Sequence, residues 1–181
     1  MNTQPMRQTG LIHLYCGEGK GKTTAAIGLI ARAAGHNRRI LLVQFLKDGR
    51  SGELLSLRRL PDVRILAGQV TDKFSIAMND AEKEATYLLH LDYFHQAVRL
   101  AEDGALDLLV LDEVLGAIET GLLPEEEVVA FLQEKPPDLE VVLTGRRPTQ
   151  ALLALADYIS EIRCVKHPYE RGILAREGIE Y

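Results

Sequence analysis

The sequence has no tryptophan and only two cysteines among its 181 residues. Because Cys16 and Cys164 show no paired spacing, neither a disulfide framework nor a zinc site is indicated, and a reducing compartment fits. The N-terminal segment MNTQPMRQTG has no apolar signal core, and no apolar run is long enough to span a membrane. These absences predict a cytoplasmic protein with no membrane partner.

An excess of positive charge is also missing. Lysine and arginine number 21 against 26 aspartates and glutamates, which gives a formal net charge of -5 and a pI of about 5.6. An acidic chain argues against a nucleic-acid partner held mainly through phosphate contacts. With 46% hydrophobic residues, the chain can bury a core of ordinary size. We expect one domain over residues 1–181, with a flexible N-terminal segment at 1–9 and a C-terminal extension at 166–181.

Short apolar runs alternate with stretches of helical spacing along the chain. The runs predict strands at Leu11–Cys16, Arg39–Phe45, Val63–Leu66, Asp107–Asp112, Glu140–Gly145 and Tyr158–Val165. The stretches between them predict helices at Thr23–Ala34, Gly52–Leu60, Asp80–Asp103, Pro124–Glu134 and Thr149–Ala156. Asp80 is expected to cap the longest of these helices. Nearly continuous apolar strands between helices predict an α/β fold with a mostly parallel sheet covered on both faces.

A glycine- and lysine-rich segment, GEGKGKTT, follows the first predicted strand and opens the first predicted helix. Such a turn can point backbone N–H groups at a phosphate, and the helix adds its dipole. Lys22 is placed to reach the outer phosphates and the Thr23 hydroxyl to bind Mg²⁺. Cys16 stands where the strict motif has its first glycine, so the loop is a variant. It predicts a nucleoside triphosphate site, and the alternative is a glycine-rich turn without a ligand. The expected phosphate-binding residues are Gly17, Glu18, Gly19, Lys20, Gly21, Lys22, Thr23 and Thr24.

A second apolar run, LLVLDE, ends in two carboxylates, Asp112 and Glu113. The carboxyl ends of parallel strands meet at one edge of a sheet, so these groups can hold or orient the Mg²⁺ bound by Thr23. The predicted metal ligands are therefore Thr23, Asp112 and Glu113. The alternative is a strand followed by a solvated acidic turn.

Several segments together resemble the P-loop corrinoid adenosyltransferases. They are GEGKGKTTAAIGLIARAAGH, VQFLK (Val43–Lys47), LDE, TGRRP (Thr144–Pro148) and the ending KHPYERGILAREGIEY. The resemblance runs from about Gly10 to Tyr181, and the combination of the first and last segments is its most specific part. It implies a P-loop NTPase fold of the RecA-like type, with three layers.

The resemblance also implies an activity. Enzymes of this family transfer the 5′-deoxyadenosyl group of MgATP to the reduced cobalt of a corrinoid and release triphosphate. The substrate is cob(I)alamin or cob(I)yrinic acid a,c-diamide, in the synthesis or salvage of adenosylcobalamin. An electron-donating reductase and a homodimer belong to the same expectation. Rate would come from aligning cobalt with C5′ and neutralising the departing triphosphate, for which Lys20 and Lys22 are suited.

Matching residues to the family pattern adds further candidates. Arg32 matches a helix arginine associated with the nucleotide, or is an exposed charge. Gln44 and Lys47 match the end of the second strand, facing the cleft, or are surface residues at the sheet edge. Phe74 matches the first member of an aromatic pair that helps exclude the lower axial ligand of cobalt. Ile76 stands where the family has tryptophan, and both side chains could instead anchor a loop in the core, as could Met78.

The predicted catalytic residues are Lys22, Glu113 and Phe74. His90 and His95 lie on the long predicted helix at a spacing that does not suit a metal pair, so both are expected to be solvated. Two other functions remain open: a P-loop nucleotide or nucleoside kinase or ATPase, and a nucleotide-switched binding module without turnover. The residues alone leave the transferase and the kinase close, and the family resemblance favours the transferase.

Overall fold

The computed structural model describes residues 9–71 and 73–180. Its centre is a parallel sheet of six strands in the order β3-β2-β4-β5-β1-β6. The strands are β1 (Ile12–Cys16), β2 (Ile40–Gln44), β3 (Val63–Ala67), β4 (Leu108–Asp112), β5 (Glu140–Thr144) and β6 (Tyr158–Glu161). The N-terminal segment expected to be flexible lies outside the described residues, except for Thr9.

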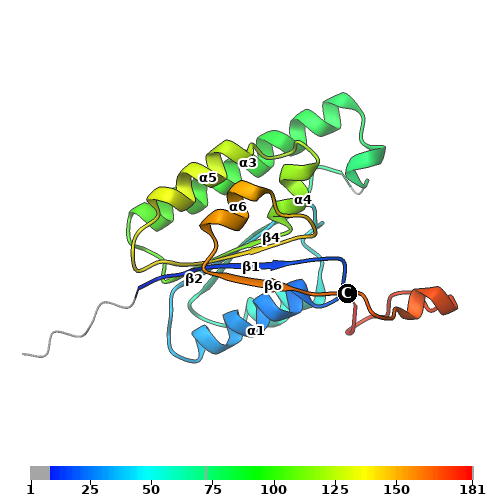
Figure 1. Cartoon of the computed structure of the whole chain (residues 1–181), viewed down its shortest axis with the longest axis horizontal. Helices are drawn as coiled ribbons and strands as arrows, with labels where there is room; N and C mark the ends of the chain where they lie inside the picture. The colour runs from blue at the N-terminus through cyan, green and yellow to red at the C-terminus, as the bar shows by residue number, and fades with distance from the viewer. Residues whose placement is uncertain (1–8, 72, 181) are drawn as a thin grey trace, which may run out of the picture.

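Helices cover both faces of the sheet, which gives three layers (Figure 1). One face carries α1 (Lys22–Ala34) and α2 (Gly52–Leu57), which pack together in one apolar cluster. The other carries α3 (Asp80–Glu102), α4 (Val114–Glu119), α5 (Glu125–Glu134) and α6 (Gln150–Leu155). Two short 3₁₀ turns complete the set, η1 (Ser75–Ala77) and η2 (Pro168–Arg171). The predicted α/β fold with a mostly parallel sheet is confirmed.

The apolar strands explain why both faces are covered. Side chains alternate between the two faces of a strand, so a strand that is apolar throughout must bury both. Leu41 and Val43 of β2 pack against α3 and its neighbours, whereas Ile40 and Leu42 pack against α1. No helix of the described residues is long and apolar enough to cross a membrane.

Two predictions about the elements are wrong, and one helix was missed. The cap of α3 is Asn79, not Asp80: the Asn79 side chain accepts from the Glu82 N–H and the Glu82 carboxylate accepts from the Asn79 N–H. Helix α4 was not predicted. The last strand ends at Glu161 rather than Val165.

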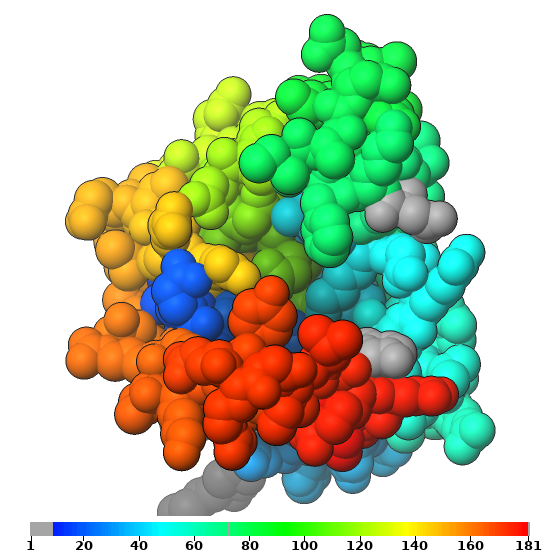
Figure 2. All heavy atoms as spheres, turned by 90° about the vertical axis from the view of Figure 1, so that its right-hand side faces the viewer, coloured from blue at the N-terminus to red at the C-terminus, as the bar shows by residue number. Residues whose placement is uncertain are grey.

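The carboxyl ends of all six strands meet at one edge of the sheet, where ligands of open α/β sheets bind. Strand β5 lies between β1, which leads into the glycine-rich loop, and β4, which ends in Asp112. Figure 2 looks at this end of the molecule. The C-terminal tail crosses it in red, the first turns of α3 stand above in green, and the surface between them is hollowed.

Candidate active site

The glycine-rich loop has the backbone conformation that its glycines allow. Gly17 and Gly21 have φ of 105° and 121°, a region that L side chains rarely adopt. A Cβ at Gly17 would lie 2.5 Å from the Ile162 carbonyl oxygen, whereas a Cβ at Gly21 would meet nothing within 4 Å. The Gly19 N–H donates to the Ile162 oxygen at 2.7 Å. The loop is therefore fixed on one side by the chain beyond β6 and open on the other.

Lys22 starts α1 and is largely buried. Its ammonium group donates to the carbonyl oxygens of Gly17, at 2.7 Å, and Gly19, at 2.9 Å. These contacts fix the positively charged Lys22 ammonium group beside the backbone of the glycine-rich loop. A phosphate seated there would meet this cation and the N–H groups at the start of α1.

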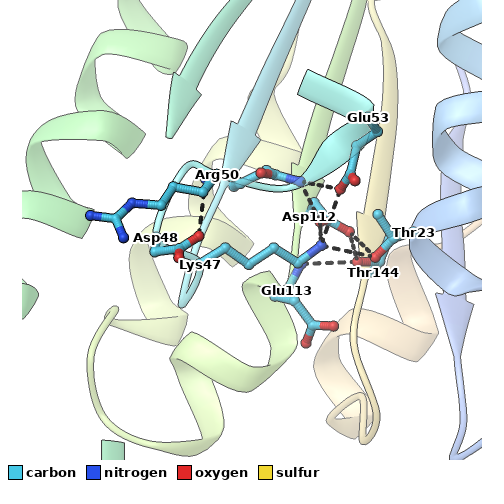
Figure 3. Close-up of polar contacts among 9 residues, drawn as sticks. Thr23, Lys47, Asp48, Arg50, Glu53, Asp112, Glu113 and Thr144 are labelled. Atoms are coloured by element: carbon cyan, nitrogen blue, oxygen red, sulfur yellow. Dashed lines mark hydrogen bonds and ion pairs between the residues drawn. The ribbon is translucent and has the colours of Figure 1, made fainter. Parts of the chain in front are cut away.

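The carboxylate of Asp112 is the centre of a buried polar cluster (Figure 3). Its Oδ1 accepts from the hydroxyl groups of Thr23, at 2.9 Å, and Thr144, at 2.7 Å. Its Oδ2 accepts from Lys47 Nζ at 2.7 Å and from Gln44 Nε2 at 3.2 Å. The structure thus brings the predicted residues Thr23, Gln44, Lys47 and Asp112 into one cluster.

Two further side chains of the cluster were not predicted, Thr144 and Glu53. Thr144 ends β5 and accepts a hydrogen bond from the Glu113 N–H at 2.9 Å. Glu53 accepts from Gln44 at 3.1 Å and lies 3.7 Å from Lys47 Nζ. The signal for Thr144 was available, since it is a polar residue next to the end of the apolar strand predicted at Glu140–Gly145.

Glu113 has a left-handed backbone, with φ of 59°, and so does Leu46, with φ of 57°. Such conformations cost on the order of 1–3 kcal/mol at residues other than glycine and often occur at functional sites. Burial, reinforced by the negative charge of Asp112, raises the pKa of the Glu113 carboxyl group. Figure 3 shows this carboxyl group directed away from the Asp112 cluster. Of the predicted metal ligands, the structure brings together Thr23 and Asp112 but not Glu113.

The donor set fits Mg²⁺. This ion prefers oxygen ligands, and it usually takes one or two from the protein and the rest from water and phosphates. Thr23 Oγ1 and the Asp112 carboxylate supply such oxygens next to the phosphate loop. Gln44 Oε1 is a buried oxygen in the same cluster without a hydrogen-bond partner among the described residues. No group of three or more His, Cys, Asp or Glu side chains in the described part of the chain forms a metal site of its own.

A pocket adjoins the cluster, between the segment after β2 and the loop that contains η1. Its lining combines apolar side chains with three basic ones and one acidic one. The lining residues are Leu46, Lys47, Asp48, Arg50, Ser51, Gln69, Lys73, Phe74, Ser75 and Met78. Lys47 belongs both to this pocket and to the Asp112 cluster, so the two sites are continuous.

The aromatic candidate of the loop lies at this pocket. Phe74 is 85% exposed and Ile76 is 95% exposed, so the alternative that they anchor the loop in the core is wrong for both. Met78, in contrast, is buried and accepts a hydrogen bond from Thr86. Phe74 is therefore accessible to a ligand of the pocket.

Other predicted residues lie outside the cluster. Lys20 forms an ion pair with Glu180 of the tail, 3.0 Å long, and Glu18 pairs with Arg146. Thr24 is exposed on the first turn of α1. Arg32 lies in the last turn of α1, at the end opposite the glycine-rich loop, so the structure does not bring it to the predicted nucleotide site within this chain.

The two histidines of α3 differ. His95 is half-exposed and pairs with Glu127 at 2.6 Å. His90 is completely buried, and the prediction that it is solvated is wrong. The His90 ring lies on the inner face of α3, where its Nε2 atom is 3.4 Å from the Leu46 N–H and its Nδ1 atom is 3.3 Å from the Leu122 carbonyl oxygen.

Two solved structures superpose on most of this chain at low sequence identity. The KaiC-like protein PH0186 of Pyrococcus horikoshii superposes on this chain with a TM-score of 0.53 and 16% identity. The superposition covers 86% of this chain and 73% of the PH0186 chain. The cytoplasmic domain of EssC superposes with a TM-score of 0.52 and 16% identity. This chain covers only 34% of the EssC chain. At these identities the likeness shows the fold alone, and the predicted fold class is confirmed.

The sequence comparisons extend over almost the whole chain. Corrinoid adenosyltransferases of Escherichia coli K12 and Salmonella typhimurium LT2 are each 36% identical to it, over 98% of this chain and 89% of theirs. The sequence model of the family described as ATP:corrinoid adenosyltransferase BtuR/CobO/CobP matches residues 8–181. The chain therefore belongs to the ATP:corrinoid adenosyltransferase family, a family of transferases.

Proposed function

We propose that this protein transfers the 5′-deoxyadenosyl group of ATP to the reduced cobalt of a corrinoid and releases triphosphate. One observation carries the proposal beyond family membership. A phosphate loop and a pocket of mixed apolar and basic lining are continuous through Lys47, which contacts Asp112 and also lines the pocket. Two substrates can therefore lie next to each other at this edge of the sheet, as a transfer between them requires.

The phosphate loop suits the departure of triphosphate. The cobalt–carbon bond forms as the bond from C5′ to the triphosphate oxygen breaks, and that oxygen keeps the bonding electrons. The N–H groups at the start of α1 and the Lys22 ammonium are placed to stabilise this negative charge. No proton has to be moved at the carbon atom.

Mg²⁺ would be held by Thr23 and Asp112 together with the phosphates. When bound, it supplies positive charge that neutralises the triphosphate. In the described structure the Lys47 ammonium lies between these two residues, 2.7 Å from Asp112 and 3.3 Å from Thr23. A bound ion would therefore compete with Lys47 for the Asp112 carboxylate.

The pocket suits the corrinoid. Phe74 presents an exposed ring at its wall, and such a ring can pack on a flat macrocycle and keep water or an axial ligand from the cobalt. The reaction needs reduced cobalt, so we also propose that an electron-donating reductase acts with this protein. A homodimer stays a prediction from the family resemblance.

Product analysis tests the proposal. The protein is incubated anaerobically with MgATP and a chemically reduced corrinoid, and phosphorus products are identified by NMR. We expect triphosphate in a one-to-one ratio with a light-sensitive cobalt–carbon product. ADP or inorganic phosphate as the stoichiometric product would instead support the kinase or ATPase function and would overturn the transferase proposal.

A further inference from the structure

The basic side chains of the pocket differ in how they are neutralised. Lys47 is paired with Asp112 and Glu53, and Lys73 donates to Glu82 at 2.7 Å. Arg50, in contrast, makes no side-chain hydrogen bond or ion pair within residues 9–71 and 73–180. Its backbone N–H alone donates to Asp48, at 3.0 Å. Among the residues that the structure describes, Arg50 is therefore the basic residue of this lining whose side chain has no ion-pair partner.

The position of Arg50 makes it available to a ligand. Figure 3 shows its side chain extending away from the Asp112 cluster, whereas the Lys47 side chain extends into it. The guanidinium lines the same pocket as the exposed ring of Phe74 and the buried Met78. The pocket thus combines an apolar wall with an exposed guanidinium that has no ion-pair partner among the described residues.

This combination suits a ligand with an apolar body and anionic substituents around it. A guanidinium group binds a carboxylate through two parallel charge-assisted hydrogen bonds. A carboxamide at the same place would offer a single neutral oxygen acceptor and two N–H donors that the guanidinium cannot use. Corrinoids differ in this respect, because their side chains end either in carboxylates or in carboxamides.

We propose that Arg50 binds a free carboxylate on the corrinoid and thereby selects acidic, incompletely amidated corrinoids over fully amidated ones. This inference rests on the proposed function, because it names the substrate class of the same site. Lys73 contributes less than Arg50, since the Glu82 carboxylate already neutralises it. Because the site is exposed, salt weakens the selection.

Binding of two corrinoids tests the selection. Cobyrinic acid a,c-diamide and cobinamide both lack the lower nucleotide and differ mainly in carboxylates against carboxamides. Each is titrated into the full chain with MgATP, in the unreactive Co(II) state, and binding is followed by the corrinoid absorbance. We expect the wild type to bind the acid more tightly than the amide by about tenfold at low salt, a ratio that falls as salt is added.

Variants identify Arg50 as the cause. Arg50→Gln should lower affinity for the acid about tenfold and leave affinity for cobinamide within twofold, and Arg50→Lys should restore part of the difference. The matched control is Arg59→Gln, which removes an exposed arginine beyond α2 that does not line the pocket. This control should leave both affinities unchanged.

The outcomes separate this inference from the function. If both corrinoids are adenosylated and Arg50→Gln weakens both equally or neither, the selection by Arg50 is refuted and the transferase function stands. A wild type that prefers cobinamide would refute it as well. If the wild type neither binds nor adenosylates any corrinoid, the proposed function itself fails, and the selection fails with it.

Discussion

His90 should make the stability of the protein depend on pH. Burial lowers the pKa of His90 from 6.5 to about 4 in the folded protein, opposed in part by its hydrogen bond to Leu122. Between these two values the unfolded chain binds a proton that the folded one does not, so stability is complete above pH 6.5 and is lost as the pH falls. One pKa unit corresponds to about 1.4 kcal/mol. The free energy of unfolding should therefore drop by about 2 kcal/mol between pH 7 and pH 5 through His90 alone.

Urea denaturation at a series of pH values measures this loss. His90→Gln keeps a donor and an acceptor of similar reach but does not titrate, so its free energy of unfolding should fall by about 2 kcal/mol less than that of the wild type over the same range. The comparison also cancels the contribution of Glu113, because this residue is present in both proteins. Its raised pKa makes the folded protein more stable as the pH falls, opposite to the effect of His90. The control variant is His36→Gln, which replaces an exposed histidine and keeps His90. Its free energy of unfolding should fall between pH 7 and pH 5 as much as that of the wild type.

The same titration reaches the active site. Neutral His90 accepts a hydrogen bond from the N–H of Leu46, the strained residue next to Lys47, and a protonated ring has no lone pair for it. The protection factor of the Leu46 amide proton, which is its exchange rate relative to an unprotected amide at the same pH, should therefore fall as the pH approaches 4. Equal pH dependence of unfolding in wild type and His90→Gln would refute the reasoning, and so would an NMR titration that places the His90 pKa near 6.5.

Three substitutions at the site give further expectations. Lys22→Ala should lower ATP affinity at least tenfold in calorimetric titration, while the circular dichroism spectrum stays native. Lys20→Ala changes an exposed lysine that is paired with Glu180, and it should lower ATP affinity less. Equal losses of affinity would contradict the assignment of Lys22. Asp112→Asn should raise the Mg²⁺ concentration needed for half-maximal turnover and destabilise the fold by about 1–3 kcal/mol, because Lys47 loses its buried partner. An unchanged Mg²⁺ requirement would exclude Asp112 as a ligand. Phe74→Ala should change the free energy of unfolding by less than about 0.5 kcal/mol, because the side chain is exposed. The variant should lose more activity with enzymatically reduced cob(II) than with chemically prepared cob(I). Equal losses with the two substrates would contradict a role of Phe74 in ligand exclusion.

The sequence predicts the strands and the glycine-rich turn before α1 well, because both depend on local patterns. Continuous apolar runs identify every strand to within a few residues, and the glycine spacing identifies the turn before α1. Helix α4 escapes prediction because VLGAIE is short, largely apolar and continuous with the preceding strand, so no change of period marks its start.

Contacts between distant segments are less accessible to sequence reasoning. The burial of His90 had a readable signal: with Thr86, Phe94, Ala97 and Ala101 it forms the helical stripe that α3 turns to the core. The pairing of Lys47 with Asp112 had none. It depends on β2 and β4 being neighbours in the sheet and on the left-handed turn at Leu46, both of which follow from tertiary packing.

That pairing gives the site an order of events. Asp112 is fully buried, and its carboxylate already accepts hydrogen bonds from Thr23, Thr144, Gln44 and Lys47. A Mg²⁺ ion bound at Asp112 would need one of these positions, and Lys47 is the donor with like charge, so its ammonium is the group that we expect to leave. Lys47 also lines the adjoining pocket, which we propose binds the corrinoid, so its movement would change the charge that faces a ligand there. Binding of MgATP would then prepare the pocket for the corrinoid, because one lysine cannot neutralise Asp112 and an incoming carboxylate at the same time.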